Sequence, residues 1–301
     1  SVAVAFDMRA PTFRHLKYDG YKATRHGMPE ELAMQMPVMK DVLRAMNIPI
    51  YECQGWEADD VIGSMAKDAE KKGFDVYMVT PDKDYGQLIS EHIKQYKPGR
   101  SGGDDEIIDT EAVCTKYGIS RPEQVIEILT LCGDSSDNVP GVKGVGEVGA
   151  GKLIAKYDNV ENIYRHIDEL TPKQREAFLN AEGHIKMSHD LVTIKTDIVL
   201  DVKEEDMAVD FNYDPMIADL FEKYEFGSLL KHVGNIKPAV QKESRKLVYT
   251  EISAEEICVK AKKAGKCAVI TEAETSGIFS PVRSVTVSAC EDGTYYVSSG
   301  S

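Results

Sequence analysis

Short apolar runs alternate with helical patterns over the first part of the chain. Val2–Phe6, Ile48–Tyr51 and Asp75–Thr80 have the length and apolar content of buried strands. Between these runs, apolar residues recur at helical spacing over residues 29–46 and 57–73. This alternation predicts an α/β fold with a mostly parallel central sheet flanked by helices.

The pattern becomes helical in the middle of the chain and changes again near its end. Residues 91–108 contain an expected loop, and helical spacing follows over 110–117, 122–131, 152–157, 160–167, 172–188 and 211–233. Residues 234–245 are polar and suggest a linker. Strands are expected at 246–252, 267–271, 284–290 and 294–298, with a helix at 254–264. This last part predicts a partial α+β segment, the start of a domain whose remainder is absent.

Composition narrows the classes of protein that fit. The net charge of −14 over 301 residues argues against a nucleic-acid binder that uses its whole surface, but leaves room for a local basic stripe. The six cysteines form no C-x-x-C pair, which fits free thiols in a reducing cytoplasm better than a zinc site. We find no signal peptide and no apolar run that could span a membrane, so no membrane partner is expected.

Acidic residues gather where the expected strands end and where one helix begins. Asp7 follows the first strand, and Asp82 and Asp84 follow the third. Glu57, Asp59 and Asp60 open the helix at 57–73, although acids there also serve as helix caps. These residues converge on one edge of a parallel sheet, where carboxylates repel unless cations lie between them. An all-oxygen ligand set favours two or more Mg²⁺ or Mn²⁺ ions, and such sites suit two-metal phosphodiester hydrolysis.

The stretch Cys132–Ile154 combines an acidic pair with a glycine-rich turn. Asp134 and Asp137 stand three residues apart, a spacing that places both on one face of a helical turn. The turn Pro140–Gly146 lets backbone N–H groups approach an anion closely. An Asp-rich turn before a helix is the alternative interpretation.

Basic and aromatic residues are interleaved over residues 9–27. Arg14, Lys22 and Arg25 could attract phosphates, and aromatics such as Phe13 and Tyr21 could stack on bases. This mixture suits a path for single-stranded nucleic acid, and a solvated charged face is the alternative.

Several motifs in a fixed order resemble one family. Its matching segments are Ala5–Asp7 to Thr12–Arg14, Tyr21-Lys22 with Arg25, Glu57–Gly63, Asp82–Asp84, Gly133–Gly141 with Gly144–Glu147, Thr193–Asp197 and Lys223–Phe226. Together they resemble the 5′-nuclease domain of bacterial DNA polymerase I, in the flap endonuclease family. The resemblance covers residues 1–233. It implies a resolvase- or PIN-like core over about 1–110 and a helix-hairpin-helix subdomain over about 111–233.

The resemblance also implies a role for each matching residue. The metal ligands would be Asp7, Glu57, Asp59, Asp60, Asp82, Asp84, Asp134 and Asp137. Tyr21, Lys22 and Arg25 would contact DNA at the base of a helical arch, with catalytic roles for Lys22 and Arg25. Duplex DNA would be gripped by the helix-hairpin-helix turn, often with a K⁺ ion on its carbonyls: Gly141, Val142, Lys143, Gly144, Val145 and Gly146.

The implied activity is Mg²⁺-dependent cleavage of 5′ flaps, nicked duplexes and RNA–DNA primer junctions in DNA replication and repair. The protein is expected to act as a monomer in the bacterial cytoplasm, associated with the nucleoid. Two other functions fit the residues: a catalytically incomplete fragment that binds DNA junctions, and a ribonuclease with a similar acidic sheet edge. The glycine turn counts against the ribonuclease.

Three departures from the family pattern stand out. The family begins with a strand carrying an aspartate, and this strand would precede Ser1. Pro81 stands where the family usually has glycine. The segment from residue 246 is similar to the start of a 3′–5′ exonuclease domain, but its first acidic motif falls on Thr271–Glu274 with Thr271 and Ala273 at the essential acidic positions. Residues 246–301 are therefore expected to be a degenerate 3′–5′ exonuclease-like segment.

Overall fold

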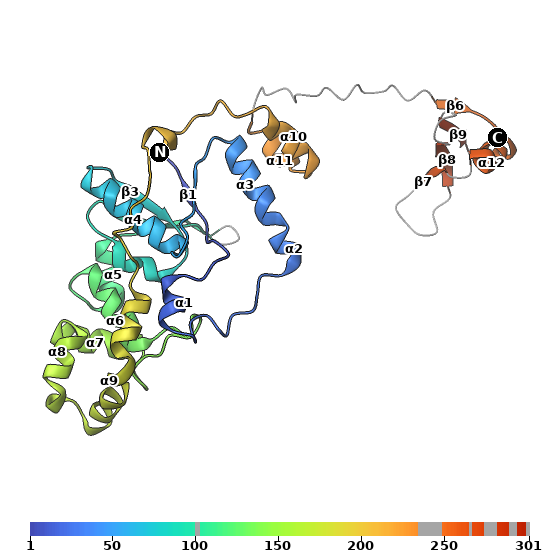
Figure 1. Cartoon of the computed structure of the whole chain (residues 1–301). Coiled ribbons are helices and arrows are strands. Elements are labelled where there is room, and N and C mark those ends of the chain that lie inside the picture. The colour runs from blue at the N-terminus through green and yellow to red at the C-terminus, as the bar shows by residue number, and fades with distance from the viewer. Residues whose placement is uncertain (100–102, 234–248, 265–266, 274–281, 289–293, 299–301) are drawn as a thin grey trace. The chain divides into compact units, whose positions relative to one another are not determined.

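A computed structural model describes residues 1–99, 103–233, 249–264, 267–273, 282–288 and 294–298 (Figure 1). The chain divides into two compact units, residues 1–239 and residues 240–301. The expected linker at 234–245 lies outside the described residues. Each unit is therefore described by itself.

The strands of the first unit form a mostly parallel core, as the alternating pattern predicts. β1 (Val4–Ala5) pairs in parallel with β2 (Ile50–Tyr51). β3 (Val76–Val79) pairs in parallel with β4 (Ile93–Lys97), and β4 pairs antiparallel with β5 (Glu106–Ile108). Hydrogen bonds thus join these strands in two groups rather than in one continuous sheet.

Strands β4 and β5 flank the loop expected within residues 91–108. β4 alternates buried Ile93 and Gln95 with the more exposed Lys94 and Tyr96, which is the period of a half-buried strand. The nearby Pro98-Gly99 and Gly102-Gly103 pairs obscured this short alternation in the sequence. The expected loop at 98–105 falls between these two strands, and the strands themselves were not predicted.

Four helices accompany the strands of the core: α1 (Phe13–Lys17), α2 (Glu30–Ala33), α3 (Gln35–Ala45) and α4 (Ala58–Lys71). The single helix expected over 29–46 is divided at Met34. Pro37 explains the break, because it has no N–H to bond the carbonyl of Ala33 four residues earlier. Helix α4 follows the expected pattern and buries Val61 and Ala66.

The middle of the chain folds into a helical subdomain. Its elements are η1 (Lys83–Leu88), α5 (Thr110–Tyr117), η2 (Pro122–Gln124), α6 (Val125–Cys132), α7 (Glu147–Tyr157), α8 (Val160–Arg165), η3 (Ile167–Glu169) and α9 (Pro172–Val192). Helix α6 is apolar on nearly every side and packs against both α7 and α9. The sequence runs straight from α6 into the acidic pair and the glycine turn, so this buried helix fixes where both begin.

The last elements of the first unit return to its amino-terminal part. They are η4 (Glu205–Met207), α10 (Met216–Lys223) and α11 (Gly227–Leu230). Ile217 and Phe221 of α10 pack on Ala45 of α3. The continuous helix expected over 211–233 is interrupted, because Glu225 adopts a left-handed backbone conformation with φ of 59°.

The described residues of the second unit form a four-stranded sheet and one helix. The strands β6 (Tyr249–Glu251), β7 (Ala268–Ala273), β8 (Val282–Ser288) and β9 (Thr294–Ser298) lie in the order β6-β9-β8-β7. Helix α12 (Ala254–Ala264) contacts β9. Residues 246–248, Glu274 and Cys290 lie outside the described residues. Within the described part of the chain, no helix is both long and apolar enough to cross a membrane.

Candidate functional site

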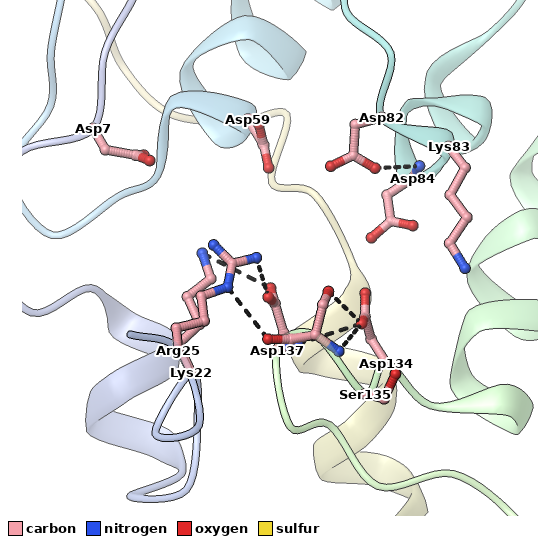
Figure 2. Close-up of a pocket in the computed structure, with 11 residues that line it drawn as sticks. Asp7, Lys22, Arg25, Asp59, Asp82, Lys83, Asp84, Asp134, Ser135 and Asp137 are labelled. Carbon is pink, nitrogen blue, oxygen red and sulfur yellow. Dashed lines mark hydrogen bonds and ion pairs between the residues drawn. The ribbon is translucent and has the colours of Figure 1, made fainter. Parts of the chain in front are cut away.

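A pocket with a volume of about 470 Å³ lies where the strand ends, α4 and the α6–α7 connection meet (Figure 2). Its lining is almost wholly polar: Asp7, Lys22, Arg25, Asp59, Asp82, Lys83, Asp84, Asp134, Ser135, Ser136 and Asp137. Asp7, Asp59, Asp82 and Asp84 project into a common space, and Lys22 and Arg25 reach it from the opposite side. The structure thus brings together six of the eight carboxylates singled out in the sequence.

The acidic pair after α6 lines this pocket in a different local structure from the one expected. Asp134 forms an antiparallel bridge with Val139, so residues 134–139 are a tight turn rather than a turn of helix. The Asp134 carboxylate accepts hydrogen bonds from the backbone N–H and the hydroxyl of Ser136, both at 2.7 Å. These bonds lower the pKa of Asp134 against the opposing effect of burial. Gly133 begins the turn with φ of 68°, where an added Cβ would lie 2.5 Å from the carbonyl oxygen of Val139.

Asp60 is placed away from the pocket, contrary to its expected role as a metal ligand. Its carboxylate is fully buried and receives the Arg14 guanidinium on both oxygens, at 2.6 and 2.8 Å. It also accepts from the backbone N–H groups of Glu57 and Lys195. With its lone pairs engaged in this way, Asp60 ties α1, α4 and the segment after α9 together and has no room for an ion.

Tyr21 is also placed differently from the expectation of a DNA-contacting residue. Its side chain is 4% exposed, so its ring cannot stack on a base in this structure. Its hydroxyl lies 3.0 Å from a carboxylate oxygen of Glu57 and 3.0 Å from one of Asp137. Tyr21 therefore holds the Glu57 and Asp137 carboxylates through its hydroxyl and presents no aromatic surface to DNA.

The two expected catalytic cations are already paired with carboxylates. The Lys22 ammonium lies 2.7 Å from Glu57 and 3.8 Å from Asp137, and the Arg25 guanidinium pairs with Asp137. Glu57, 6% exposed, is thereby covered by Lys22 and does not itself line the pocket. The pairing neutralises part of the negative charge on one side of the pocket.

The opposite side of the pocket holds carboxylates without such partners. Burial raises the pKa of Asp84 to about 7, with repulsion from Asp82 and Asp134 adding to it. Burial likewise raises the pKa of Asp59 to about 6, partly offset by a hydrogen bond from Tyr85 and reinforced by Asp82. Within the described residues, Asp84 Oδ1 is a buried side-chain oxygen that has no hydrogen-bond partner.

This donor set fits a hard divalent cation. An unsatisfied buried carboxylate oxygen is costly, and a cation among oxygen ligands relieves both its desolvation and the repulsion from its neighbours. The described residues nevertheless contain no group of three His, Cys, Asp or Glu side chains already close enough to hold one ion. The carboxylates line the pocket together without three of them meeting at one point.

Gln95 positions the acidic loop after β3, and sequence reasoning missed it. Its buried side chain, 2% exposed, donates from Nε2 to the carbonyl oxygens of Thr80 and Asp82, at 2.9 and 2.7 Å. The Asp82 carboxylate in turn accepts from the backbone N–H of Asp84 at 3.0 Å. A glutamine at a buried position of an alternating strand was the available signal, but it required recognising β4.

The glycine turn between α6 and α7 is partly exposed, and side chains of α9 contact its carbonyls. Gly144 has φ of 81°, which a glycine adopts without strain, and Lys143 beside it is exposed while Val142 is buried. From α9, Ser188 donates to the Pro140 carbonyl at 2.6 Å, and His184 lies 3.3 Å from the Gly141 carbonyl. Helix α7 then starts at Glu147, with Gly146 as a cap residue that has no side chain, so the backbone N–H groups of its exposed first turn have no side-chain cap.

Family models and known relatives agree with this architecture. The model of the 5′–3′ exonuclease N-terminal resolvase-like domain matches residues 1–118, and that of the 5′–3′ exonuclease C-terminal SAM fold matches residues 120–214. Thermostable DNA polymerase I of Thermus aquaticus is 39% identical over 235 residues, 78% of this chain and 27% of that protein. DNA polymerase I of Bacillus subtilis is 40% identical over 233 residues, 77% of this chain and 26% of that protein. The chain thus spans about a quarter of these relatives.

Solved structures give the same fold at low sequence identity. The flap endonuclease of bacteriophage T5, in a pseudo-enzyme–product complex with DNA and metal ions, is 19% identical with a TM-score of 0.54, covering 78% of this chain and 82% of that one. The 5′-exonuclease of the same phage with divalent zinc ions has a TM-score of 0.52 at 19% identity, covering 78% and 83%. The predicted α/β core with its helical subdomain is thereby confirmed. The chain belongs to the family of 5′–3′ exonuclease domains found in bacterial DNA polymerase I.

Proposed function

We propose that this chain is a divalent-metal-dependent, structure-specific 5′ nuclease that hydrolyses phosphodiesters at 5′ flaps, nicks and RNA–DNA primer junctions, as part of a DNA polymerase I. The observation that carries this proposal is the pocket in which six aspartates face Lys22 and Arg25. Clustered carboxylates opposite cations suit a site that holds metal ions on one side and a phosphate on the other. The relative of known structure with DNA and metal ions supports the same substrate class.

The residues that would hold Mg²⁺ or Mn²⁺ are the pocket aspartates. Asp59, Asp82 and Asp84 form the side without cationic partners, and Asp7, Asp134 and Asp137 complete the ring. Two bound ions would supply an ionised water and stabilise the charge that develops on the phosphate. Glu57 is proposed as a ligand only after Lys22 moves away from it, and Asp60 is not proposed as one.

Lys22 and Arg25 are proposed to bind the scissile phosphate. Both cations pair with Glu57 or Asp137, and so they occupy positions beside the carboxylates. When these carboxylates are engaged elsewhere, the ammonium and guanidinium groups are free to donate to phosphate oxygens. Guanidinium in particular matches phosphate with two parallel hydrogen bonds.

Duplex DNA is proposed to bind at the glycine turn. The exposed Lys143 and the uncapped N–H groups at the start of α7 form a surface for a backbone phosphate. A K⁺ ion on the carbonyls of Gly141–Gly146 would add a positive charge to this surface. We further propose that the protein acts as a monomer with the DNA of the bacterial cytoplasm.

The test is cleavage of a labelled 5′-flap duplex by the 301-residue chain with Mg²⁺ or EDTA. Asp82→Asn keeps an oxygen that can accept from the Asp84 N–H but removes one charge from the pocket. Asp75→Asn is the matched control, because Asp75 lies just before β3, away from the pocket, and its exposed side chain pairs with His92. We expect metal-dependent cutting that Asp82→Asn abolishes and Asp75→Asn leaves intact. Cutting that persists in EDTA would contradict the proposal.

A DNA-junction binding module that does not cut is the second candidate. It is favoured by the absence, among the described residues, of three acidic, histidine or cysteine side chains ready to hold an ion. Binding of the flap duplex that depends on Lys143, without product at any Mg²⁺ or Mn²⁺ concentration, would establish this function instead. An RNA flap in the same assay separates both candidates from a ribonuclease.

A further inference from the structure

One hydrogen bond links the hydrophobic core directly to the pocket. Tyr85, in η1, is 2% exposed, and its hydroxyl donates to Asp59 Oδ1 at 2.6 Å. Asp59 lies in the first turn of α4, and its side chain projects into the pocket. The bond therefore joins two elements that supply different carboxylates to the same pocket.

Asp59 depends on this bond more than Glu57 and Asp137 depend on any one of theirs. Glu57 contacts Lys22, Tyr21 and Arg14, and Asp137 contacts Lys22, Arg25 and Tyr21. For the Asp59 carboxylate, the described residues provide one hydrogen bond, that from Tyr85, and no ion pair. The direction in which Asp59 points is thus set by a single partner, which occupies Oδ1 and leaves Oδ2 without one.

The partner itself is held rigidly. Tyr85 belongs to the main hydrophobic core with Leu88 and Ile89 from the same segment. Next to it, the Gln87 side chain donates to the carbonyl of Val192 at 3.0 Å and accepts from the N–H of Ile194 at 2.9 Å. The core therefore holds the ring, and the Gln87 bonds hold the segment that carries it, so the hydroxyl lies at a defined point.

We propose that Tyr85 is a positioning residue, whose hydroxyl holds Asp59 in the orientation that binds a hard divalent cation in the pocket. This inference rests on the metal site of the proposed function and deepens it. Groups that hydrogen-bond a ligating carboxylate fix its geometry, and their loss typically weakens metal binding by about 10- to 100-fold. Among the pocket carboxylates Tyr85 hydrogen-bonds Asp59 alone, so it acts through that ligand rather than on substrate.

The decisive variant is Tyr85→Phe, which keeps the buried ring and removes only the hydroxyl. We expect the affinity for Mn²⁺, measured by calorimetric titration without DNA, to fall by about 10-fold or more. Tyr164→Phe is the matched control, because its hydroxyl donates to the carbonyl of Phe178 in the helical subdomain. Asp59→Asn serves as the reference for loss of the ligand itself.

Kinetics distinguish positioning from a general structural defect. In flap cleavage, Tyr85→Phe should raise the Mn²⁺ concentration for half-maximal rate by the same factor, while the rate at saturating Mn²⁺ and the KM for DNA stay near wild type. A lowered rate that saturating Mn²⁺ does not restore would overturn the proposal. Unchanged Mn²⁺ affinity in Tyr85→Phe or in Asp59→Asn, or a wild-type chain that binds no Mn²⁺, would also overturn it. Mn²⁺ binding weakened by Tyr85→Phe in a chain that cuts no DNA would uphold this inference while refuting the proposed nuclease.

Discussion

At the scale of single residues, the stability of the core depends on the buried ion pair between Arg14 and Asp60. Both side chains are buried, at 2% and 0% exposure, and Arg14 also donates to the carbonyls of Leu191 and Thr193. Arg14→Ala would leave the Asp60 carboxylate buried without its counter-ion, so we expect unfolding free energy to fall by about 3–5 kcal/mol. Urea denaturation measures this loss.

An exposed arginine provides the comparison. Arg165 pairs with Glu161 on the surface of α8, where both side chains are more than half exposed. Arg165→Ala should cost less than about 1 kcal/mol, because water screens such a pair and stabilises each charge after separation. Similar losses for both variants would mean that the buried pair does not hold the core as described.

Residue types alone separated pocket residues from core residues only in part. Asp82 and Asp84 follow a strand and Asp59 opens a helix, so the pocket could be anticipated from strand ends and helix starts. Asp60 is adjacent to Asp59 and has the same chemistry, yet one helical step turns it toward Arg14. Tyr85 gave no signal, because a tyrosine after an acidic motif is equally expected in a core. Whether such a residue faces the pocket or the core depends on partners distant in the chain. A pattern of neighbouring residues carries no information about those partners.

The titration of Asp84 and Asp59 predicts how pH acts on the metal-free protein. Their pKa values rise to about 7 and about 6, above the value near 4 of an unfolded aspartate. The folded state therefore binds these protons more tightly, and the stability they contribute is complete below about pH 4 and lost as pH rises through about 6–7. A bound cation has the opposite preference, because it stabilises the ionised carboxylates.

Thermal unfolding at two pH values checks this sign. Mn²⁺ should raise Tm by several degrees more at about pH 8 than at about pH 5, where protons compete for the same oxygens. Asp84→Asn should flatten the fall in metal-free Tm between these values. A larger Mn²⁺ effect in acid would contradict the assignment of Asp59 and Asp84 to the metal side of the pocket.

At the scale of elements, one ion pair connects the acidic loop with the helix that follows the glycine turn. Lys83 of η1 lies 3.2 Å from Glu147, the first residue of α7. Both side chains are nearly half exposed, so the pair adds little to stability. Its consequence is electrostatic: the Glu147 carboxylate sits at the helix terminus that is proposed to receive a DNA phosphate, and it also neutralises Lys83.

Glu147→Gln is therefore predicted to strengthen duplex binding. The change removes a negative charge beside the phosphate site and frees Lys83, so we expect about 2- to 5-fold tighter binding of duplex DNA in EDTA. Fluorescence anisotropy at fixed ionic strength measures it. Glu169→Gln, which breaks an exposed pair with Lys156, is the control and should have no effect. Weaker binding by Glu147→Gln would show that Glu147 supports the turn rather than opposing the phosphate.

The elements themselves were predictable where one local rule dominates. Helix α5 coincides with the expected 110–117, because Asp109 caps its start and Gly118 adopts φ of 67° at its end. Strands β4 and β5 were missed, since their short length and the glycines between them hide an alternation that matters only once β4 lies between β3 and β5. The break between α2 and α3 at Met34 shows how one proline overrides an unbroken apolar pattern.

At the scale of the whole molecule, charge sets the conditions for binding DNA. A net charge of −14 repels a polyanion, and the pocket concentrates negative charge beside the cations that would meet a phosphate. Lys22 and Arg25 are neutralised by Glu57 and Asp137 as long as no metal competes for those carboxylates. DNA affinity should therefore be low in EDTA and should depend on divalent ions before any bond is cut.

Equilibrium binding of a 5′-flap duplex with Ca²⁺ or EDTA tests this dependence. Ca²⁺ is a hard cation that takes the same oxygen ligands as Mg²⁺. We expect binding at least about 10-fold tighter with Ca²⁺ than with EDTA plus NaCl at matched ionic strength, because filling the pocket removes repulsion and releases two cations toward the phosphate. The Asp82→Asn, Asp84→Asn double variant should bind more tightly than wild type in EDTA and respond less to Ca²⁺, since it carries less charge for the ion to compensate. If wild type binds equally with and without Ca²⁺, the pocket does not control access to DNA, and the glycine turn alone must account for the affinity.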